Sequence, residues 1–350
     1  MKSDLKLQED GFCLEFFSGQ GDVFQNDSSE HKELLLNENM YILQEIIIVP
    51  PDMMSQANNF SAGTFAPLRC NKPLIFTGHP DLPVQYAAIA AKVEKEKVSV
   101  ARSDTGIKIT ADGINLLYSA PVFDSHGSGR PFMTAFNKIS EVLRGFQMSE
   151  SAIARTWLFI RDILNDYEEL NKAREQFFEK WNPAANQILP ASTGIQNHII
   201  GNEILAFEFC AFSGEHVTVK QISSPLQNEP TAYGKLFSRA VVAGFPRSKL
   251  LFVSGTAAID KAGASVYIGN FKSQMEFTLE VISAILKQEN CSFSNVVQAI
   301  VYLKRSKDMS SCFQILDQAG FPRERTLFQP GVDICRDNLL CEIEAMAVIS

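Results

Sequence analysis

The hydrophobic pattern of the chain is clearest near its C-terminal end, between residues 341 and 349. Successive residues of a strand point to opposite faces, so Glu342, Glu344 and Met346 share one face while Ile343 points to the other. Both faces are mostly apolar, which predicts a strand that is covered on both sides. Burial disfavours a charged carboxylate, so each glutamate is expected either to pair with a cation or to keep a proton near neutral pH.

A helix-then-strand pattern occurs twice in the chain, at an offset of 143 positions that brings Ile139 onto Ile282. The register continues without a gap into the next apolar run, where Trp157 meets Ile300. We interpret the two copies as α+β units, each a mixed β-sheet with helices packed on one face. The predicted helices are 133–147 and 272–287 before the strands, and 166–180 and 308–319 after them.

Turn-forming residues indicate where the two copies separate. The stretch from Asn182-Pro183 to Gly194 is rich in such residues and lies between the copies. We therefore expect an N-terminal domain over residues 1–183, with an irregular insertion at about 48–75, and a C-terminal domain over residues 184–350 that carries the active site.

Composition and charge narrow the classes of partner. The chain has 350 residues, 45% of them hydrophobic, with a net charge of -8 and a pI near 5.3. Nucleic acids and anionic membranes reward clustered Lys and Arg, so neither is expected as a partner. The first residues lack an apolar signal core, which favours a cytoplasmic protein. The seven cysteines include no CxxC pair, which argues against a disulfide framework or a zinc site.

Several short motifs resemble those of known proteins. Ser254-Gly255-Thr256 and Glu342-Ile343-Glu344 are similar to motifs of the RidA/YjgF superfamily, whose members are small α+β proteins that form trimers with ligand clefts between subunits. A narrower set resembles the chorismatases, which are built from RidA-like domains and remove pyruvate from chorismate. Its segments are Arg155-Thr156-Trp157, Tyr167 with Asn171 and Arg174, residues 189–195, Tyr233-Gly234, residues 237–240, and Cys335-Arg336.

The resemblance covers most of residues 130–350 and implies an enzyme that needs no cofactor. Its reaction would convert chorismate to pyruvate and a hydroxybenzoate, with 3-hydroxybenzoate as the expected product. The sequence departs from the chorismatase pattern at Lys235-Leu236 and in the loop 260–269, which bears on the identity of substrate and product.

Glu342 is the candidate catalytic acid. Cleavage of an enol ether begins with proton delivery to the vinyl carbon, so the donor must still hold its proton near neutral pH. Apolar neighbours raise the pKa of a carboxyl group in the required direction. The alternative is a structural ion pair between Glu342 and Arg325 or Arg336. Glu344 lies on the same strand face and is expected to assist indirectly or to be structural.

Cys335 is the second catalytic candidate. It precedes Glu342 by seven residues, at a position that by resemblance distinguishes enzymes making 3-hydroxybenzoate from those making a dihydroxylated product. Its expected role is covalent or steric guidance of ring aromatisation, and a cysteine nucleophile works best as the thiolate. The alternative is a small buried apolar residue.

Chorismate carries two carboxylates, which arginine grips better than lysine through paired N–H bonds. The candidates by resemblance are Arg155, Arg239 and Arg325, and the last matches the arginine that binds the substrate carboxylate in RidA proteins. Tyr233 is expected to donate a hydrogen bond to the substrate, and the backbone of Gly255-Thr256-Ala257 to line its ring. The alternatives are solvated surface arginines and a half-buried core tyrosine.

Two other functions stay open from the sequence. One is a RidA-type deaminase, which uses an arginine and a glutamate to hydrolyse imines or enamines, although Leu327 stands where many RidA proteins have a cysteine. The other is a non-catalytic YjgF-like protein that binds a small metabolite. The expected partner in each case is a small anionic ligand. The assembly is also open, between a homo-oligomer and a pseudo-trimer whose third unit is folded from residues 1–120.

Overall fold

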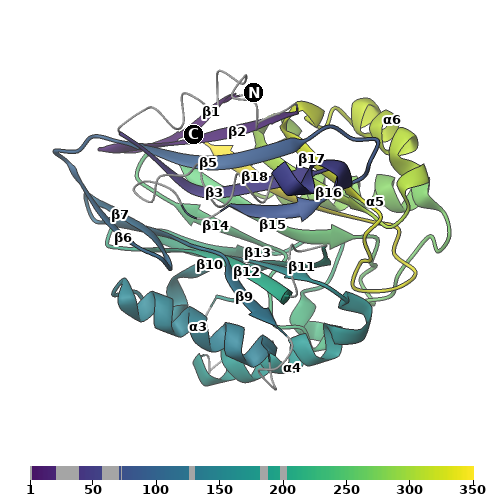
Figure 1. Ribbon diagram of the computed structural model, residues 1–350, viewed down its shortest axis with the longest axis horizontal. Helices are drawn as coiled ribbons and strands as arrows, with labels where there is room; N and C mark the ends of the chain where they lie inside the picture. The colour runs from purple at the N-terminus through teal and green to yellow at the C-terminus, as the bar shows by residue number, and fades with distance from the viewer. Residues whose placement is uncertain are drawn as a thin grey trace.

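The computed structural model describes residues 2–20, 39–56, 71, 73–125, 131–181, 188–197 and 203–350. These residues form three β-sheets, which we name sheets A, B and C in chain order. In Figure 1, sheet A is drawn in purple and blue, sheet B mostly in blue and teal, and sheet C in green and yellow. Helices α3 and α4 lie against sheet B at the bottom of the view, and helices α5 and α6 lie at the right.

Sheet A has five strands in the order β1-β2-β5-β3-β4. Neighbouring strands are antiparallel except for the parallel pair of β3 and β4. The strands are β1 (Lys2–Gln8), β2 (Phe12–Gln20), β3 (Met40–Val49), β4 (Leu74–Thr77) and β5 (Gln85–Val93), and a short 3-10 turn, η2 (Pro51–Met53), follows β3.

Sheet B follows the order β11-β10-β12-β8-β7-β6, and β9 also pairs with β12. The pair of β10 and β11 is parallel, and the other pairs are antiparallel. Its elements are β6 (Val98–Ser103), β7 (Gly106–Ala111), β8 (Ile114–Ser119), β9 (Val122–Ser125), α3 (Pro131–Gly145), η3 (Glu150–Ala152), β10 (Ile153–Ile160), α4 (Ile163–Trp181), β11 (Ala191–Gln196) and β12 (Glu203–Ser213).

Sheet C has the order β13-β14-β15-β18-β16-β17, again with one parallel pair, β16 and β17. Its strands are β13 (Thr218–Ile222), β14 (Ala240–Gly244), β15 (Lys249–Ala257), β16 (Val296–Leu303), β17 (Thr326–Pro330) and β18 (Cys341–Ile349). Its helices are η4 (Pro230–Tyr233), α5 (Phe271–Lys287), η5 (Phe293–Asn295), η6 (Ser306–Asp308), α6 (Met309–Ala319) and η7 (Arg323–Arg325).

The three sheets repeat one strand order. In each sheet a parallel pair at one edge is followed by a strand antiparallel to its inner member, namely β5, β12 or β18. Each of these strands pairs across a register irregularity, at Ile42–Gln44 in sheet A, Ile153–Arg155 in sheet B and Val296–Gln298 in sheet C. Sheet A, between residues 2 and 93, thus has the strand order of a third unit, whereas residues 98–119 of the expected 1–120 belong to sheet B.

The repeat predicted at an offset of 143 is confirmed, because Arg155 of β10 and Gln298 of β16 occupy the same register position 143 residues apart. The helices form because apolar residues recur at helical spacing. In α5, Leu279, Ile282 and Leu286 are buried against sheet C. This helix begins after Asn270, whose side chain accepts a hydrogen bond from a backbone amide of the first turn.

Strand β18 is covered on both faces, as its pattern predicts. Cys341, Ile343 and Ala345 pack with residues of α5 and α6 in one core cluster. Met346 and Val348, on the opposite face, pack in a second cluster that includes residues of all three sheets. The two glutamates of β18 lie on this second face, between the sheets.

The prediction of turns at residues 191–194 is wrong, because Ala191–Gln196 form strand β11 alongside β10. Tertiary packing overrides local preference here, since Thr193 is almost fully buried. The boundary expected between residues 183 and 184 falls inside sheet B, because β11 and β12 follow it and pair with β10. Much of the insertion expected at 48–75 lies outside the described residues.

Candidate active site

Glu342 lies near the start of β18 and is 4% exposed. Burial raises the pKa of its carboxyl group to about 8, with a further increase from nearby Glu344 and an opposing effect from Arg155. The carboxyl group therefore keeps its proton at neutral pH. Among the described residues, Glu342 forms no ion pair with Arg325 or Arg336, whose guanidinium groups bind other partners.

Gly255 on β15 leaves room for this carboxyl group. A methyl group at Gly255 would overlap Oε1 of Glu342 and would lie 3.2 Å from Cγ2 of Thr193. Thr193 belongs to β11 of sheet B, and its Oγ1 accepts a hydrogen bond of 3.0 Å from the Gly255 amide. Glu342 thus lies where sheets B and C meet.

Thr256 and Ala257, which follow Gly255, make contacts within the fold. The Thr256 hydroxyl donates a hydrogen bond of 2.8 Å to the carbonyl of Ser254. Ala257 packs in the core, and its carbonyl accepts a 3.0 Å hydrogen bond from Gln227. Of the three expected lining residues, Gly255 borders the Glu342 carboxyl group, and Ala257 pairs with Glu342 in the strand register.

Arg155 has an anionic partner inside the protein. Its Nη2 donates a hydrogen bond of 2.6 Å to Oε2 of Glu344, and it also bonds to Oγ1 of Thr193. The guanidinium carbon lies 5.1 Å from the ring centroid of Trp157, and the side chain is 2% exposed. Arg155 therefore lies close to Glu342, but its charge is already balanced.

A second group of cations has no such partner. We call Arg174, Lys235, Arg239 and Arg336 the cation cluster, because electrostatic effects on Tyr233, Lys235 and the Cys335 thiol connect its members. Within the described ranges, none of the four forms an ion pair with a carboxylate at 4.0 Å or less. Buried cations without counter-ions are costly, so such a cluster suits an anionic ligand.

Arg174 reaches this cluster from α4 and is 3% exposed. It donates hydrogen bonds to Oδ1 of Asn171 at 3.4 Å and to Oγ of Ser192 at 3.3 Å. Its guanidinium carbon lies 5.5 Å from the ring centroid of Phe237. Neutral partners and an aromatic ring hold the group in place but leave its charge unbalanced.

Lys235 lies over the ring of Tyr167, with Nζ 5.1 Å from the ring centroid. Burial lowers the pKa of Lys235, and the positive charges of Arg174 and Arg336 lower it further. Lys235 therefore lies close enough to Arg174 and Arg336 for the positive charges to repel one another. A bound dianion would relieve that repulsion.

Arg239 and Tyr233 form a fixed pair in the same region. Arg239 donates to the Tyr233 hydroxyl at 2.8 Å and, through Nε and Nη2, to the carbonyl of Asn228 at 3.0 and 2.8 Å. Burial raises the pKa of Tyr233, so its hydroxyl stays neutral and can still donate its own proton to a ligand. Tyr233 is half-buried, which fits that role and the core alternative equally.

Cys335 lies near both the cation cluster and Glu342, because Arg336, Lys235 and Glu342 all act on its thiol. Burial raises the pKa of its thiol to about 12, the Glu342 carboxyl adds to the rise, and Arg336 and Tyr167 oppose it. The thiol is therefore neutral at pH 7. A nucleophilic role would first require a base to remove its proton.

Arg325 lies at a different boundary. Its Nη1 donates to the carbonyls of Ser294 at 3.3 Å and Val296 at 2.9 Å. The neighbouring carbonyl of Glu324 accepts a 3.0 Å hydrogen bond from Ser18 of sheet A. Arg325 thus lies where sheets A and C meet, and the structure does not bring it together with Glu342.

The strand register gives Glu342 an equivalent in each of the other sheets. Glu342 pairs with Tyr302 of β16, Ala206 of β12 pairs with Phe159 of β10, and Gln85 of β5 pairs with Ile48 of β3. In each pair, the residue of β16, β10 or β3 lies four positions after the residue that follows the register irregularity of that strand. An acid therefore occupies this position in sheet C alone among the three sheets.

Gln85 shows how another boundary differs. Its side-chain amide donates to the carbonyl of Phe328 at 2.9 Å and accepts from the Phe328 amide at 2.8 Å. These two hydrogen bonds tie β5 of sheet A to β17 of sheet C. The strand position that carries Glu342 in sheet C thus carries, in sheet A, a glutamine that joins sheets A and C.

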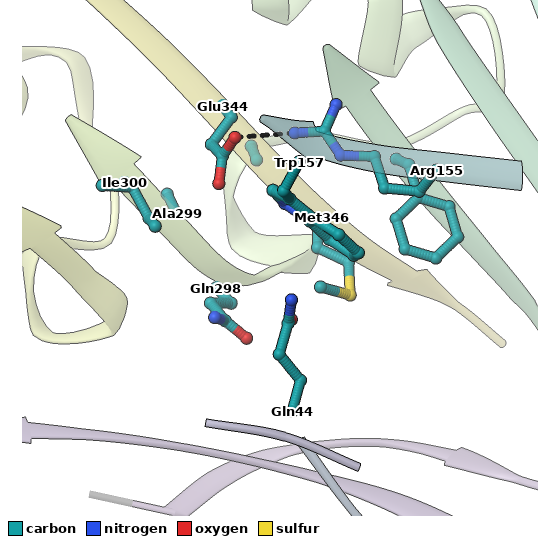
Figure 2. Close-up of a pocket in the computed structure, with 10 residues that line it drawn as sticks. Gln44, Arg155, Trp157, Gln298, Ala299, Ile300, Glu344 and Met346 are labelled. Carbon is teal, nitrogen blue, oxygen red and sulfur yellow. Dashed lines mark hydrogen bonds and ion pairs between the residues drawn. The ribbon is translucent and has the colours of Figure 1, made fainter. Parts of the chain in front are cut away.

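The three sheets meet at a small cavity of about 20 Å³, which is lined by Gln44, Arg155 and Gln298, one from each sheet (Figure 2). These residues are equivalent, because each directly follows the register irregularity of its strand. Figure 2 shows Arg155 and Glu344 joined by their ion pair on one side of this cavity. The volume suits about one water molecule rather than a metabolite.

The cavity and the cation cluster are therefore separate features of the molecule. Arg174, Lys235 and Arg336 were not among the residues expected at the site, although each falls in or beside one of the motifs that resemble the chorismatases. Their importance depends on the lack of carboxylate partners, which only the three-dimensional arrangement shows. No helix of the described segments is long and apolar enough to cross a membrane.

The chain is similar in sequence to several known proteins. Residues 227–349 match the family model described as Endoribonuclease L-PSP. A 3-hydroxybenzoate synthase of Streptomyces hygroscopicus is 27% identical over 311 residues, which cover 80% of this chain and 88% of that protein. A RutC family protein of Pyrococcus horikoshii is 31% identical over 123 residues, which cover 35% of this chain and 92% of that protein.

The fold matches a solved structure over almost its whole length. A crystal structure of a chorismatase superposes with a TM-score of 0.69 and 17% identity, covering 97% of this chain and 100% of that one. The similarity thus includes all three sheets, and the RutC-type match is limited to about one of them. The chain belongs to the RidA/YjgF superfamily, as its RutC family relative shows, and over most of its length it resembles the chorismatases.

Proposed function

We propose that this chain is a chorismatase that removes pyruvate from chorismate and leaves a hydroxybenzoate, with 3-hydroxybenzoate as the product. The 3-hydroxybenzoate synthase that matches 80% of the chain supports this product. The observation that carries the proposal is a protonated buried acid, Glu342, near a cluster of cations that have no anionic partner in the described part of the chain.

Glu342 acts as the proton donor in this proposal. Its carboxyl group gives a proton to the methylene carbon of the enolpyruvyl group, which makes the neighbouring carbon electrophilic. Water adds to that carbon and returns a proton to the Glu342 carboxylate, and the bond between that carbon and the ether oxygen then breaks to release pyruvate. The ether oxygen stays on the ring as the 3-hydroxyl group, and loss of the 4-hydroxyl group together with the hydrogen on ring carbon 3 releases water and leaves 3-hydroxybenzoate. Pyruvate and a hydroxybenzoate together contain all the atoms of chorismate, so the conversion needs no oxidant and no net water.

The cation cluster holds the two carboxylates of the substrate. Arg174 and Arg239 are fixed by hydrogen bonds to neutral groups, so their remaining N–H groups can bind a carboxylate without first breaking an ion pair. Lys235 and Arg336 add positive charge on the side of Cys335. Tyr233 donates a hydrogen bond, and the Cys335 thiol lies near the ring and biases the product.

A RidA-type deaminase is less well supported. That chemistry uses an arginine together with a glutamate, and here Arg325 and Glu342 lie at different sheet boundaries. At the boundary that holds Arg325, the position equivalent to Glu342 is Gln85. In sheet B, Ala191 occupies the position equivalent to Arg325, so that sheet has no arginine there. Each of the two residues directly precedes a strand residue that pairs with an equivalent position of the neighbouring strand.

The third unit also bears on the assembly. Glu342 and its neighbours come from sheets B and C of one chain, so a single chain supplies the proposed site. We expect a monomer to be active in a cytoplasmic setting, where the free cysteines stay reduced. Light scattering of the active fraction measures the mass directly.

The test is incubation of the purified full-length protein with chorismate, followed by chromatography for aromatic acids and an enzymatic assay for pyruvate. We expect equal amounts of pyruvate and 3-hydroxybenzoate. Glu342→Gln should abolish both, because an amide cannot supply the proton. Glu208→Gln is the matched control, since Glu208 is also buried with its pKa raised to about 8 but lies in sheet B, beside Gln44. Equal activity of Glu342→Gln and the parent protein would contradict the proposal.

A further inference from the structure

Glu342 and Glu344 lie on the same face of β18, and a single cation serves both. Nη2 of Arg155 binds Oε2 of Glu344 at 2.6 Å. Burial raises the pKa of Glu344, and the charge of Arg155 together with hydrogen bonds from Thr193, Trp157 and Arg155 opposes that rise and favours the carboxylate. Arg155 comes from β10 of sheet B, so the ion pair crosses the boundary between sheets B and C beside the proposed acid.

The balance of charge decides which carboxyl group is ionised. Glu342, Glu344 and Glu208 are buried in this region, and the negative charge of Glu344 raises the pKa of Glu342 and of Glu208. Among the described residues, Arg155 is the cation that acts on Glu342 and Glu344, and an arginine stays protonated even when burial lowers its pKa. One positive charge balances one carboxylate, and Glu344 is the group in direct contact with it.

Apart from the cation cluster next to Cys335 and Tyr167, the other titratable groups beside Glu342 are neutral at pH 7. Tyr302 of β16 and Tyr167 of α4 have pKa values raised by burial, and the same is true of the thiols of Cys335 and Cys341. Gly255 on β15 and Thr193 on β11 carry no charge. Glu344 and Arg155 are thus the charged groups that bear most directly on Glu342.

We propose that Glu344, held by Arg155, is a positioning residue that keeps the Glu342 carboxyl group protonated. Glu344 occupies the guanidinium of Arg155 and leaves Glu342 without a cationic partner. If Glu344 were neutral, the same guanidinium would favour ionisation of Glu342, and the acid would be lost. The inference deepens the proposed function and rests on it for its catalytic meaning, while the proton state of Glu342 can be measured without substrate.

The two members of the ion pair should therefore have opposite effects. Glu344→Gln leaves the Arg155 charge unbalanced, so we expect Glu342 to ionise at lower pH. A fall of about two pH units would reduce the protonated fraction at pH 7 about tenfold. Arg155→Gln removes the competing cation, so Glu342 should stay protonated to pH 8 or above. Glutamine is a suitable replacement, because Gln44 and Gln298 occupy the equivalent positions.

The decisive variant is the double substitution Arg155→Gln with Glu344→Gln, which removes both charges. We expect it to restore a protonated Glu342, whereas a purely structural pair predicts that it is at least as damaging as Glu344→Gln. Isotope-edited infrared titration of the glutamate carboxyl band, with Glu342→Gln to assign it, reads the proton state in substrate-free protein. The basic limb of the rate profile with chorismate should move in parallel.

The control is Glu208→Gln, which removes a buried carboxyl group whose pKa Glu344 raises in the same way, and it should leave the Glu342 titration in place. An unchanged titration in Glu344→Gln, or no recovery in the double variant, would overturn the inference. If Glu344→Gln does not fold, a downward shift in Arg155→Gln would overturn it equally. A shift and recovery in protein that does not turn over chorismate would leave the inference standing and remove the proposed function.

Discussion

The carboxyl group of Glu342 lies against the Cα of Gly255, in a space that a single methyl group would fill. The two residues belong to neighbouring strands, and Glu342 pairs directly with Ala257 rather than with Gly255, so the side chain leans along β15. Thr193 of sheet B closes the same space from the other side. A glycine at this position is therefore a steric requirement of the acid's placement.

Gly255→Ala should reduce turnover while leaving most of the fold intact. The added methyl group displaces the Glu342 carboxyl group, and small displacements of a catalytic group cost about a hundredfold in rate. Steady-state kinetics with chorismate, together with a thermal melt, separate the two effects. Gly145→Ala is the control, because a methyl group at Gly145 meets no atom within 4 Å. Full activity of Gly255→Ala would show that the site tolerates the overlap.

Replacing Glu342 by glutamine should raise the stability of the fold and abolish the activity. Its pKa is raised in the folded protein to about 8, so the folded state holds a proton that the unfolded state has released, and stability falls as pH rises from the ordinary carboxyl range towards 8. Each pH unit in that window costs about 1.4 kcal/mol. We expect Glu342→Gln to stabilise the fold at pH 7 by roughly 2–3 kcal/mol while abolishing activity.

The measurement is urea denaturation of the parent and the variant at pH 5 and pH 7.5. The gain in stability should be larger at the higher pH, and the activity of the parent should fall as pH rises through about 8. Glu208→Gln should gain stability in the same way but keep its activity, since burial also raises the pKa of Glu208 to about 8. An equal gain in stability at pH 5 and at pH 7.5 would show that Glu342 is ionised in the folded protein at both pH values.

Arg174→Met should weaken substrate binding far more than it weakens the fold. A hydrogen bond to a charged group contributes about 1.5–3 kcal/mol, which corresponds to a rise in KM of roughly 10-fold to 100-fold. Arg325→Met is the matched control, because Arg325 binds backbone carbonyls at the boundary of sheets A and C. We expect that control to keep its KM and to lose some thermal stability. Similar KM values for both variants would remove Arg174 from the binding site.

Cys335→Ala should change the product more than the rate. The thiol is neutral at pH 7, because burial raises its pKa to about 12, so its removal leaves the charge near Glu342 unchanged. We expect the dihydroxylated product to rise at the expense of 3-hydroxybenzoate in chromatography of the reaction. Cys312→Ala serves as the control, since that thiol is also buried with its pKa raised to about 12 but lies on α6. An unaltered product ratio would exclude Cys335 from product control.

Much of sheets B and C could be predicted from the sequence, because helices and buried strands have strong periodic patterns. The helix expected at 272–287 is observed at Phe271–Lys287, and the one expected at 166–180 at Ile163–Trp181. The common strand order of sheet A was not predictable in the same way. Its likeness to the other sheets is a matter of strand pairing and register, which depend on contacts between distant residues.

The candidate site was only partly predictable for a related reason. Glu342 was predicted from its apolar neighbours along the strand, and the structure agrees that burial raises its pKa. Arg325 was chosen by a match along the sequence, which does not tell which sheet boundary a residue faces. Arg174 shows the converse, since a motif contains it but only the spatial arrangement reveals that its charge has no carboxylate partner among the described residues.

The equivalence of Gln85, Ala206 and Glu342 has a consequence for how such a protein can change over time. In an assembly of identical subunits, a substitution at this position would appear at every boundary at once. Here the three copies are joined in one chain, so each boundary can acquire or lose a proton donor separately. Covalent fusion therefore lets one copy specialise in chemistry while the others are free to favour cohesion.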